Sequence, residues 1–332
     1  MLQFLRKIAF PFSLIYALIV HVRNYLFDWG VFKSISYETP TICVGNLSVG
    51  GTGKTPMIEY LIRILSNHKI AVLSRGYKRK SKGFLLANPS STVADLGDEP
   101  FQIHQKFPNI YVAVDADRRN GIAQLEKMVQ PDVILLDDAF QHRKVKPKFS
   151  ILLTAYGQLY PKGWYLPTGN LRDAKREARR ADVIVVTKCP KILPKTEKDT
   201  ITSLIQPKPH QQLLFSHLSY AEKLKDGKGN KVAPSKLGDK KIALVTGIAS
   251  PEPLVQYLRD IGIDFQHLAF GDHHNFSSDE IEKFKHYDAV LTTEKDFVRL
   301  YGRVEPLYYL EIAHDFNLED ENLLKEVVES QF

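Results

Sequence analysis

Short runs of apolar residues alternate with longer segments of mixed polarity along most of this 332-residue chain. The runs have the length of buried strands, whereas residues 56–66 carry apolar side chains at helical spacing. The runs that we interpret as strands are 41–44, 70–73, 111–114, 133–136, 150–154 and 183–187. Short strands separated by helix-length segments are typical of an α/β fold, with a parallel sheet covered by helices on both faces.

The pattern changes after residue 212. Between 213 and 237, apolar and polar residues alternate around Asp226-Gly227-Lys228-Gly229-Asn230, a turn signal between two strands. Strand-like runs return at 242–246, 265–269 and 289–292. We therefore predict an N-terminal segment (1–28), a first domain (29–212), a β-hairpin linker (213–237) and a second, smaller α/β domain (238–332).

The N-terminal segment is almost wholly apolar from residue 8 to residue 22, with Arg6 and Lys7 before it and Arg23 after it. This run is short for a bilayer core, which needs roughly 20 apolar residues. No small-residue cleavage site of a signal peptide follows it. On a helix, the apolar residues form one stripe and Ser13 and Asn24 fall opposite. The pattern fits a helix in a membrane interface, or a helix packed on the domain.

Composition and charge narrow the class of protein. A hydrophobic content of 44% excludes a disordered chain, and Cys43 and Cys189 lie in apolar runs typical of buried thiols. The formal net charge of +7 favours an anionic partner, such as nucleotide phosphate or an anionic membrane surface. The basic clusters lack the aromatic pattern of RNA-binding modules, and no DNA-reading motif is present, so we expect no nucleic-acid partner.

A glycine-rich loop follows the first predicted strand and precedes a helix. Its backbone N–H groups would curl around phosphate, Lys54 would reach the β- and γ-phosphates, and the Thr55 hydroxyl would bind Mg²⁺. The strict pattern has glycine where this chain has Ser48, but the Gly-Lys-Thr core and the strand–loop–helix context remain. The predicted nucleotide-binding residues are Ser48, Val49, Gly50, Gly51, Thr52, Gly53, Lys54 and Thr55.

Two carboxylates follow another predicted strand, at 133–136. Asp137 and Asp138 would lie at the carboxyl end of the sheet, where P-loop enzymes hold Mg²⁺. Gln141 and His142 follow closely enough to face the same cleft. Thr187-Lys188 has the form of a guanine-reading motif, but Pro190 stands where that motif needs aspartate. We therefore predict ATP as the nucleotide.

Taken together, the motifs resemble the family of tetraacyldisaccharide 4′-kinases, the lipid A 4′-kinases of Gram-negative bacteria. The resemblance runs through nearly the whole chain, and two departures are Ala139 for glycine and Asp173 for glutamate. The motifs are 45–46 with 50–56, 74–77, 97–100, 137–142, 167–173, 246–251, 272–274 and 293–296.

The resemblance implies a P-loop NTPase-type sheet and a reaction. ATP would phosphorylate the 4′-hydroxyl of an acylated glucosamine disaccharide 1-phosphate to give lipid IVA, in the lipid A biosynthesis that precedes lipopolysaccharide. The enzyme would be peripheral, at the cytoplasmic face of the bacterial inner membrane. Two alternatives are a P-loop phosphotransferase with a soluble acceptor and a nucleotide-dependent switch without acceptor turnover.

The resemblance also assigns roles at the site. Asp98 matches the family's proposed base, His273 or His274 would tune it, and Lys54 and Asp138 would act in phosphoryl transfer. The predicted metal-binding residues are Thr55, Asp137, Asp138, Gln141 and Asp173. Guanidinium groups offer forked donors to phosphate, and the predicted substrate-binding residues are Arg75, Asp98, Arg118, Arg119, Asn170 and Arg172. We predict that the site closes between the two domains.

Overall fold

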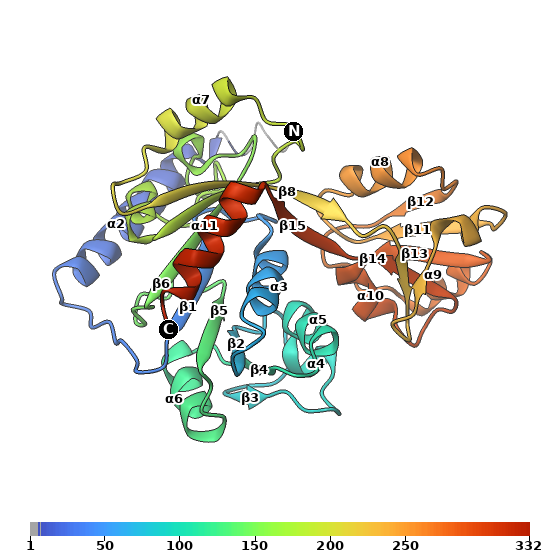
Figure 1. Cartoon of the computed structure of the whole chain (residues 1–332), viewed down its shortest axis with the longest axis horizontal. Coiled ribbons are helices and arrows are strands. Elements are labelled where there is room, and N and C mark those ends of the chain that lie inside the picture. Colours follow the sequence, from blue (N-terminus) through green and yellow to red (C-terminus); the bar gives the residue numbers. More distant parts are fainter. Residues whose placement is uncertain (1–5, 7) are drawn as a thin grey trace.

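The computed structural model describes residue 6 and residues 8–332, and within them the strands form two sheets (Figure 1). The first sheet has the order β15-β8-β7-β6-β1-β5-β2-β4-β3, parallel from β8 to β4 and antiparallel at both edges. Its strands are β1 (Thr41–Asn46), β2 (Ile70–Ser74), β3 (Leu85–Leu86), β4 (Tyr111–Val114), β5 (Val133–Asp137), β6 (Phe149–Ala155), β7 (Val183–Thr187), β8 (Gln212–Tyr220) and β15 (Ile312–Phe316). The predicted strands of this sheet and its α/β class are confirmed.

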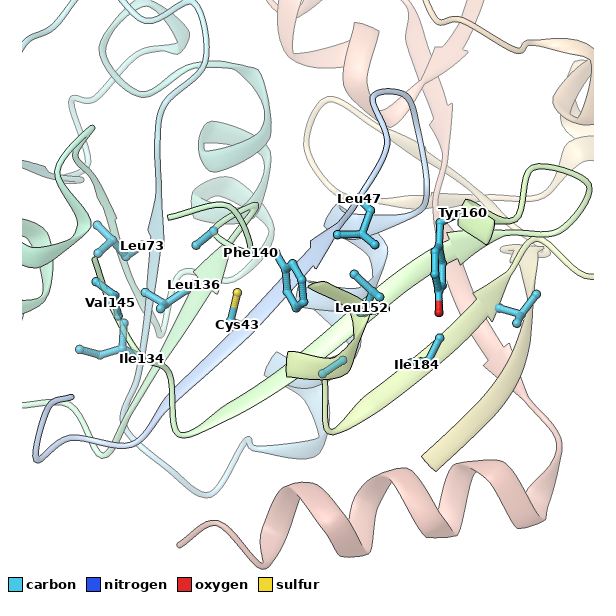
Figure 2. Close-up of a cluster of buried hydrophobic side chains, with 14 of the residues drawn as sticks. Cys43, Leu47, Leu73, Ile134, Leu136, Phe140, Val145, Leu152, Tyr160 and Ile184 are labelled. Carbon is cyan, nitrogen blue, oxygen red and sulfur yellow. The ribbon is translucent and has the colours of Figure 1, made fainter. Parts of the chain in front are cut away.

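Helices cover both faces of the first sheet because its central strands are apolar on both. In β1, Ile42 and Val44 face one buried cluster, while Cys43 faces the other, shown in Figure 2. Helices α3 and α11 fill the first cluster, and α6 and α7 fill the second. The helices around this sheet are α3 (Lys54–Ile64), α4 (Val93–Leu96), α5 (Asp98–Lys106), α6 (Arg118–Met128), α7 (Lys195–Ile205) and α11 (Leu318–Glu329), with short 3₁₀ turns at Tyr160–Lys162 and Lys175–Arg180.

The second sheet has the order β10-β9-β14-β13-β11-β12. The strands predicted at 242–246, 265–269 and 289–292 are present, and the turn at 226–230 joins β9 and β10 as predicted. Its elements are β9 (Leu224–Asp226), β10 (Lys231–Val232), the 3₁₀ turn Pro234–Leu237, β11 (Ile242–Thr246), α8 (Glu252–Asp260), β12 (Gln266–Ala269), α9 (Ser278–Phe284), β13 (Ala289–Thr293), α10 (Glu294–Leu300) and β14 (Leu307–Leu310).

The structure differs from the predicted domain boundaries at two places. The expected linker 213–237 is divided, because β8 pairs with β7 in the first sheet and β9 begins the second. The expected second domain, 238–332, ends early, because β15 returns to pair with β8. Leu324 and Val328 of α11 then complete a core cluster of the first sheet. The chain therefore crosses between the sheets twice.

A buried cluster of charges around Lys106, at the end of α5, joins the two sheets. The Lys106 ammonium lies 2.6 Å from Glu59 of α3, 2.5 Å from Glu294 of α10 and 3.0 Å from Glu311. Burial and the nearby Glu59 raise the pKa of Glu294 to about 7. Because a buried charge without a partner is strongly destabilising, this cluster favours one arrangement of the two sheets.

Helix α2 (Phe10–Asp28) buries Ser13, Val20 and Asn24 against the protein and leaves most of its large apolar residues exposed. Ser13 and Asn24 are buried, whereas Phe12 and Ile19 are 66% and 60% exposed. Among the described residues, α2 is the one helix long and apolar enough to cross a bilayer by length and composition. Residues 1–5 and Lys7, part of the predicted basic flank, lie outside the described residues. The helix thus packs on the domain and still leaves an apolar stripe free.

The packing of β1 against Phe140 gives a testable consequence. A Cβ at residue 45 would lie 2.5 Å from the Phe140 Cβ, and Phe140 is 1% exposed. We expect Gly45→Ala to destabilise the fold by roughly 1–3 kcal/mol through overpacking, measured as a lowered midpoint of thermal unfolding. The control is Gly271→Ala, because a Cβ there meets open space. Equal midpoints for the two variants would contradict the packing described.

Candidate active site

The phosphate loop between β1 and α3 is held in place by hydrogen bonds from three directions. The Asn46 amide donates to Thr52 Oγ1 (3.0 Å), and the Thr187 hydroxyl donates to the Thr52 carbonyl (2.8 Å). The Val49 N–H donates to the Asn170 carbonyl (2.7 Å). Gly53 adopts the left-handed conformation (φ 88°) just before α3 begins. The loop is therefore shaped before any ligand binds.

The loop has the features that a triphosphate requires. A Cβ at Gly50 would meet no atom within 4 Å, and one at Gly51 would have the Lys188 Nζ as its neighbour, at 3.9 Å. Lys54 opens α3 and points to the end of β5, with its Nζ 3.8 Å from Asp138 Oδ1. Open space over glycines, a helix N-terminus and two ammonium groups fit the polyphosphate of ATP.

The two carboxylates that end β5 have different environments. Asp137 accepts a hydrogen bond from the Ser74 hydroxyl (2.9 Å), and burial together with the charges of Glu99 and Asp138 raises its pKa to about 7. Asp138 has φ 49° and contacts both terminal nitrogens of Arg172, one at 3.0 Å. Burial would raise the pKa of Asp138, but Lys54 and Arg172 outweigh it and lower that pKa.

The residues present fit a magnesium ion. Asp137 Oδ1 and Gln141 Oε1 are buried acceptor oxygens without a hydrogen-bond partner, and such oxygens are the ligands that Mg²⁺ prefers. Thr55 lies in the first turn of α3 and is buried. No group of three His, Cys, Asp or Glu residues that could hold a metal occurs in the described part of the chain. Mg²⁺ itself takes few protein ligands and completes its shell with phosphate and water.

Asp173 does not join these carboxylates. It is buried, its Oδ1 accepts from the Asn24 amide (2.7 Å), and Arg180 approaches its Oδ2 at 3.9 Å. These contacts turn it toward α2, whereas its neighbour Arg172 turns toward Asp138. The predicted role of Asp173 as a metal ligand is thus not supported by the structure.

Asp98 begins α5, and two residues from the part of the chain that forms the second sheet contact it. His273 Nδ1 lies 3.1 Å from Asp98 Oδ2, and Arg299 of α10 donates to the same oxygen. Burial would raise the pKa of Asp98, but hydrogen bonds from His273 and Arg299 hold that pKa well below its usual range. His274 instead contacts Glu280 at 2.9 Å. The structure therefore brings His273, and not His274, to Asp98.

The predicted substrate arginines fall into two groups. Arg75 is exposed at the end of β2, and Arg119 is partly exposed and paired with Asp117 at 3.0 Å. Arg118 is instead 2% exposed and donates to the carbonyl oxygens of Asp115 (2.8 Å) and Asp137 (3.3 Å). The structure does not present Arg118 to a ligand, because its side chain is buried and both terminal nitrogens support strand ends.

Several residues reach the site from segments that are distant in the sequence. His314 of β15 donates from Nε2 to the Gly53 carbonyl (2.8 Å) and accepts from the Ser216 hydroxyl at Nδ1 (2.9 Å). Lys295 of α10 pairs with Glu99 at 2.6 Å. Burial would raise the pKa of Glu99, but Lys295 and Lys54 outweigh it and lower that pKa. Arg299 and His314 belong to the site only because distant segments meet there.

The arrangement defines a class of protein. Phosphate-binding groups on one sheet and a carboxylate held from the other are the parts of a kinase, and the strand–loop–helix on a parallel sheet makes it a P-loop kinase. The model of the tetraacyldisaccharide-1-P 4′-kinase family matches residues 5–332. The chain belongs to this family, and the resemblance predicted from its motifs is confirmed.

Known relatives match this chain over most of their lengths. The tetraacyldisaccharide 4′-kinase of Flavobacterium johnsoniae is 50% identical over 322 residues, covering 95% of this chain and 94% of the relative. That of Bacteroides thetaiotaomicron is 46% identical, covering 89% and 83%. A crystal structure of LpxK from Aquifex aeolicus in complex with ATP superposes with a TM-score of 0.81 at 30% identity, covering 99% of each chain. The predicted fold class is confirmed.

The His314–Gly53 contact predicts a dependence of stability on pH. Burial lowers the pKa of His314 to about 4, whereas an unfolded histidine has a pKa near 6.5. The unfolded chain therefore takes up this proton first, and stability is lost as the pH falls from 6.5 toward 4. We expect His314→Gln to show a smaller drop in unfolding midpoint between pH 7 and pH 5 than the unmutated protein.

Two comparisons isolate this effect. Burial also lowers the pKa of His142 to about 4, but His142 is intact in both proteins and cancels in their difference. His286→Gln, at an exposed position, should follow the unmutated protein. Parallel curves for His314→Gln and the unmutated protein would show that His314 is not held neutral.

Proposed function

We propose that this chain transfers the γ-phosphoryl group of ATP to the 4′-hydroxyl of an acylated glucosamine disaccharide 1-phosphate. The observation that carries the proposal is the contact of Asp98 with His273. Through this contact, a residue beside the second sheet orients a carboxylate that lies beside the first. The related kinases act on tetraacyldisaccharides by their names, and the related structure contains ATP. The phosphate loop supplies the matching nucleotide site.

In this proposal, Asp98 orients the acceptor hydroxyl and takes its proton. His273 and Arg299 contact Oδ2, so Oδ1 is left to accept from the hydroxyl. A low pKa keeps Asp98 ionised at neutral pH, and proton transfer is late in the loose transition state of phosphoryl transfer. Lys54 would neutralise charge on the β- and γ-phosphates. Mg²⁺ held near Asp137, Asp138, Thr55 and Gln141 would supply further charge neutralisation.

A cavity of about 620 Å³ opens beside Asp98 and is large enough for part of a sugar acceptor. Its lining combines apolar and aromatic side chains with basic ones, as a phosphorylated sugar would require. The residues that line this cavity include Tyr77, Lys78, Lys80, Phe101, Phe276 and Arg303. The acceptor hydroxyl would therefore approach Asp98 from this side.

Helix α2 supports a peripheral position on an anionic membrane, at the cytoplasmic face of the bacterial inner membrane. Its exposed stripe is apolar, and Trp164, 60% exposed, packs edge-on against Phe10. Arg176 and Arg179 lie at the carboxyl end of α2, where both contact Asp28. An apolar stripe flanked by basic groups is the pattern of a helix lying in the interface. The active site could then reach the lipid acceptor while the acyl chains of the acceptor stay in the bilayer.

The activity is tested with labelled ATP, the disaccharide 1-phosphate and positional analysis of the product. We expect Asp98→Ala and His273→Ala each to lower kcat by about 10²–10⁴, the usual contribution of general acid–base catalysis, with little change in ATP affinity. The double variant should be scarcely worse than the worse single variant, because residues acting as a unit are non-additive.

The matched comparison is His274→Ala, which removes the neighbouring imidazole that contacts Glu280 and should lose much less activity. Fully additive losses would show that Asp98 and His273 act independently. Absence of acceptor-dependent turnover in the unmutated protein would favour a nucleotide-dependent switch over a kinase.

Membrane binding is tested on the exposed stripe. Leu18 and Ile19 are 64% and 60% exposed, and burying one such side chain is worth about 1.5–3 kcal/mol. We expect Leu18→Ser with Ile19→Ser to reduce sedimentation with anionic vesicles by roughly tenfold or more, with ATP affinity unchanged. Leu318→Ser removes a 73% exposed leucine at the start of α11 and serves as the control. If both proteins sedimented alike, α2 would not be the anchor.

A further inference from the structure

The inner face of α2, formed by Ser13, Tyr16 and Asn24, is bonded to one stretch of chain, residues 165–173, which we call the bridging segment. The Ser13 hydroxyl donates to the Tyr165 carbonyl (3.1 Å), and the Tyr16 hydroxyl donates to the Arg172 carbonyl (3.0 Å). The Asn24 amide donates to Asp173 Oδ1 at 2.7 Å. A span of about three helical turns, from Ser13 to Asn24, is thereby fixed against this segment.

The bridging segment also holds the phosphate site. The Asn170 carbonyl accepts from the Val49 N–H of the phosphate loop (2.7 Å), and the Arg172 N–H donates to the Leu47 carbonyl (2.9 Å). The Arg172 side chain contacts Asp138, with one pair at 3.0 Å, and the Asn46 amide oxygen. The segment thus has α2 on one side and the phosphate-binding residues on the other.

A second connection runs through Gln141. Arg23 of α2 donates to the Gln141 carbonyl (2.6 Å), and Arg143 donates to the Asn24 carbonyl (2.9 Å). The Gln141 amide in turn donates to the Asn46 carbonyl at 2.8 Å. Both connections end at Asn46, the last residue of β1. Two chains of hydrogen bonds, one through the bridging segment and one through Gln141, therefore connect α2 to the start of the phosphate loop.

The Asn24–Asp173 pair fixes the register of the helix. Both residues have 0% exposure, and Asp173 Oδ2 has no hydrogen-bond partner. A buried carboxylate that loses a donor costs about 1–3 kcal/mol or more, so sliding or rotating α2 is opposed. A helix that served only to anchor the protein would need no buried polar bond of this kind.

We propose that Asn24 is a positioning residue: α2 acts through Asn24 and the bridging segment to align Arg172 with Asp138 for phosphoryl transfer. The inference rests on the proposed function. The anchoring stripe and the positioning face are opposite sides of one helix.

The test compares two inner-face variants of the full-length protein bound to anionic vesicles. We expect Asn24→Ala and Tyr16→Phe to lower kcat, by about tenfold for Asn24→Ala, the usual effect of removing a supporting contact behind a metal site. The KM for the disaccharide and the sedimentation with vesicles should be unchanged. Half-saturation by Mg²⁺ should shift upward, because Asp138 is less well oriented.

The control is Tyr25→Phe, which removes a hydroxyl from the same helix at an exposed position and should leave kcat unaltered. Tyr16→Phe removes one hydroxyl only, so it reports on coupling even if Asn24→Ala unfolds. Unchanged kcat and Mg²⁺ dependence in Tyr16→Phe and in folded Asn24→Ala, beside an active unmutated protein, would overturn the coupling alone. An unmutated protein that does not phosphorylate the disaccharide would overturn the function itself.

Discussion

The phosphate loop can make its left-handed turn because residue 53 has no side chain, and the space that a side chain would need is filled by His314. A Cβ on Gly53 would lie 2.8 Å from the His314 Nε2. The imidazole is neutral, donates to the Gly53 carbonyl and is itself fixed by Ser216. The shape of the nucleotide site therefore depends on β15, a strand that the chain forms only after building the second sheet.

Contacts between the two sheets hold them in one arrangement. The Lys106 cluster joins α3, α5 and α10 by charges that would be costly to separate, and α10 also carries Arg299 to Asp98. His273 contacts Asp98 directly, so residues from both sheets meet at the candidate base. Electrostatics and chain connectivity together place the candidate base, because neither sheet alone contains the whole site.

Sequence patterns predicted those parts of the fold and of the site whose residues are close together in the chain. The central strands were predictable because they are apolar on both faces. The phosphate loop and Asp137-Asp138 were predictable because the residues of each motif are adjacent in the sequence. Strand β8 was mistaken for part of a hairpin because it is only half-buried near the edge of the sheet. Asn24, Arg299 and His314 could not be predicted, because their partners lie 149, 201 and 261 residues away.

The double crossing between the sheets has a consequence for biosynthesis. Residues 224–310 form an insertion within the first sheet, so the ribosome completes the inserted unit before it releases β15 and α11. Until then β8 has an unpaired edge, the α3 side of the core lacks Leu324 and Val328, and the Gly53 carbonyl lacks its donor. The nascent chain cannot assemble a finished nucleotide site, and kinase chemistry is withheld until translation reaches the last strand.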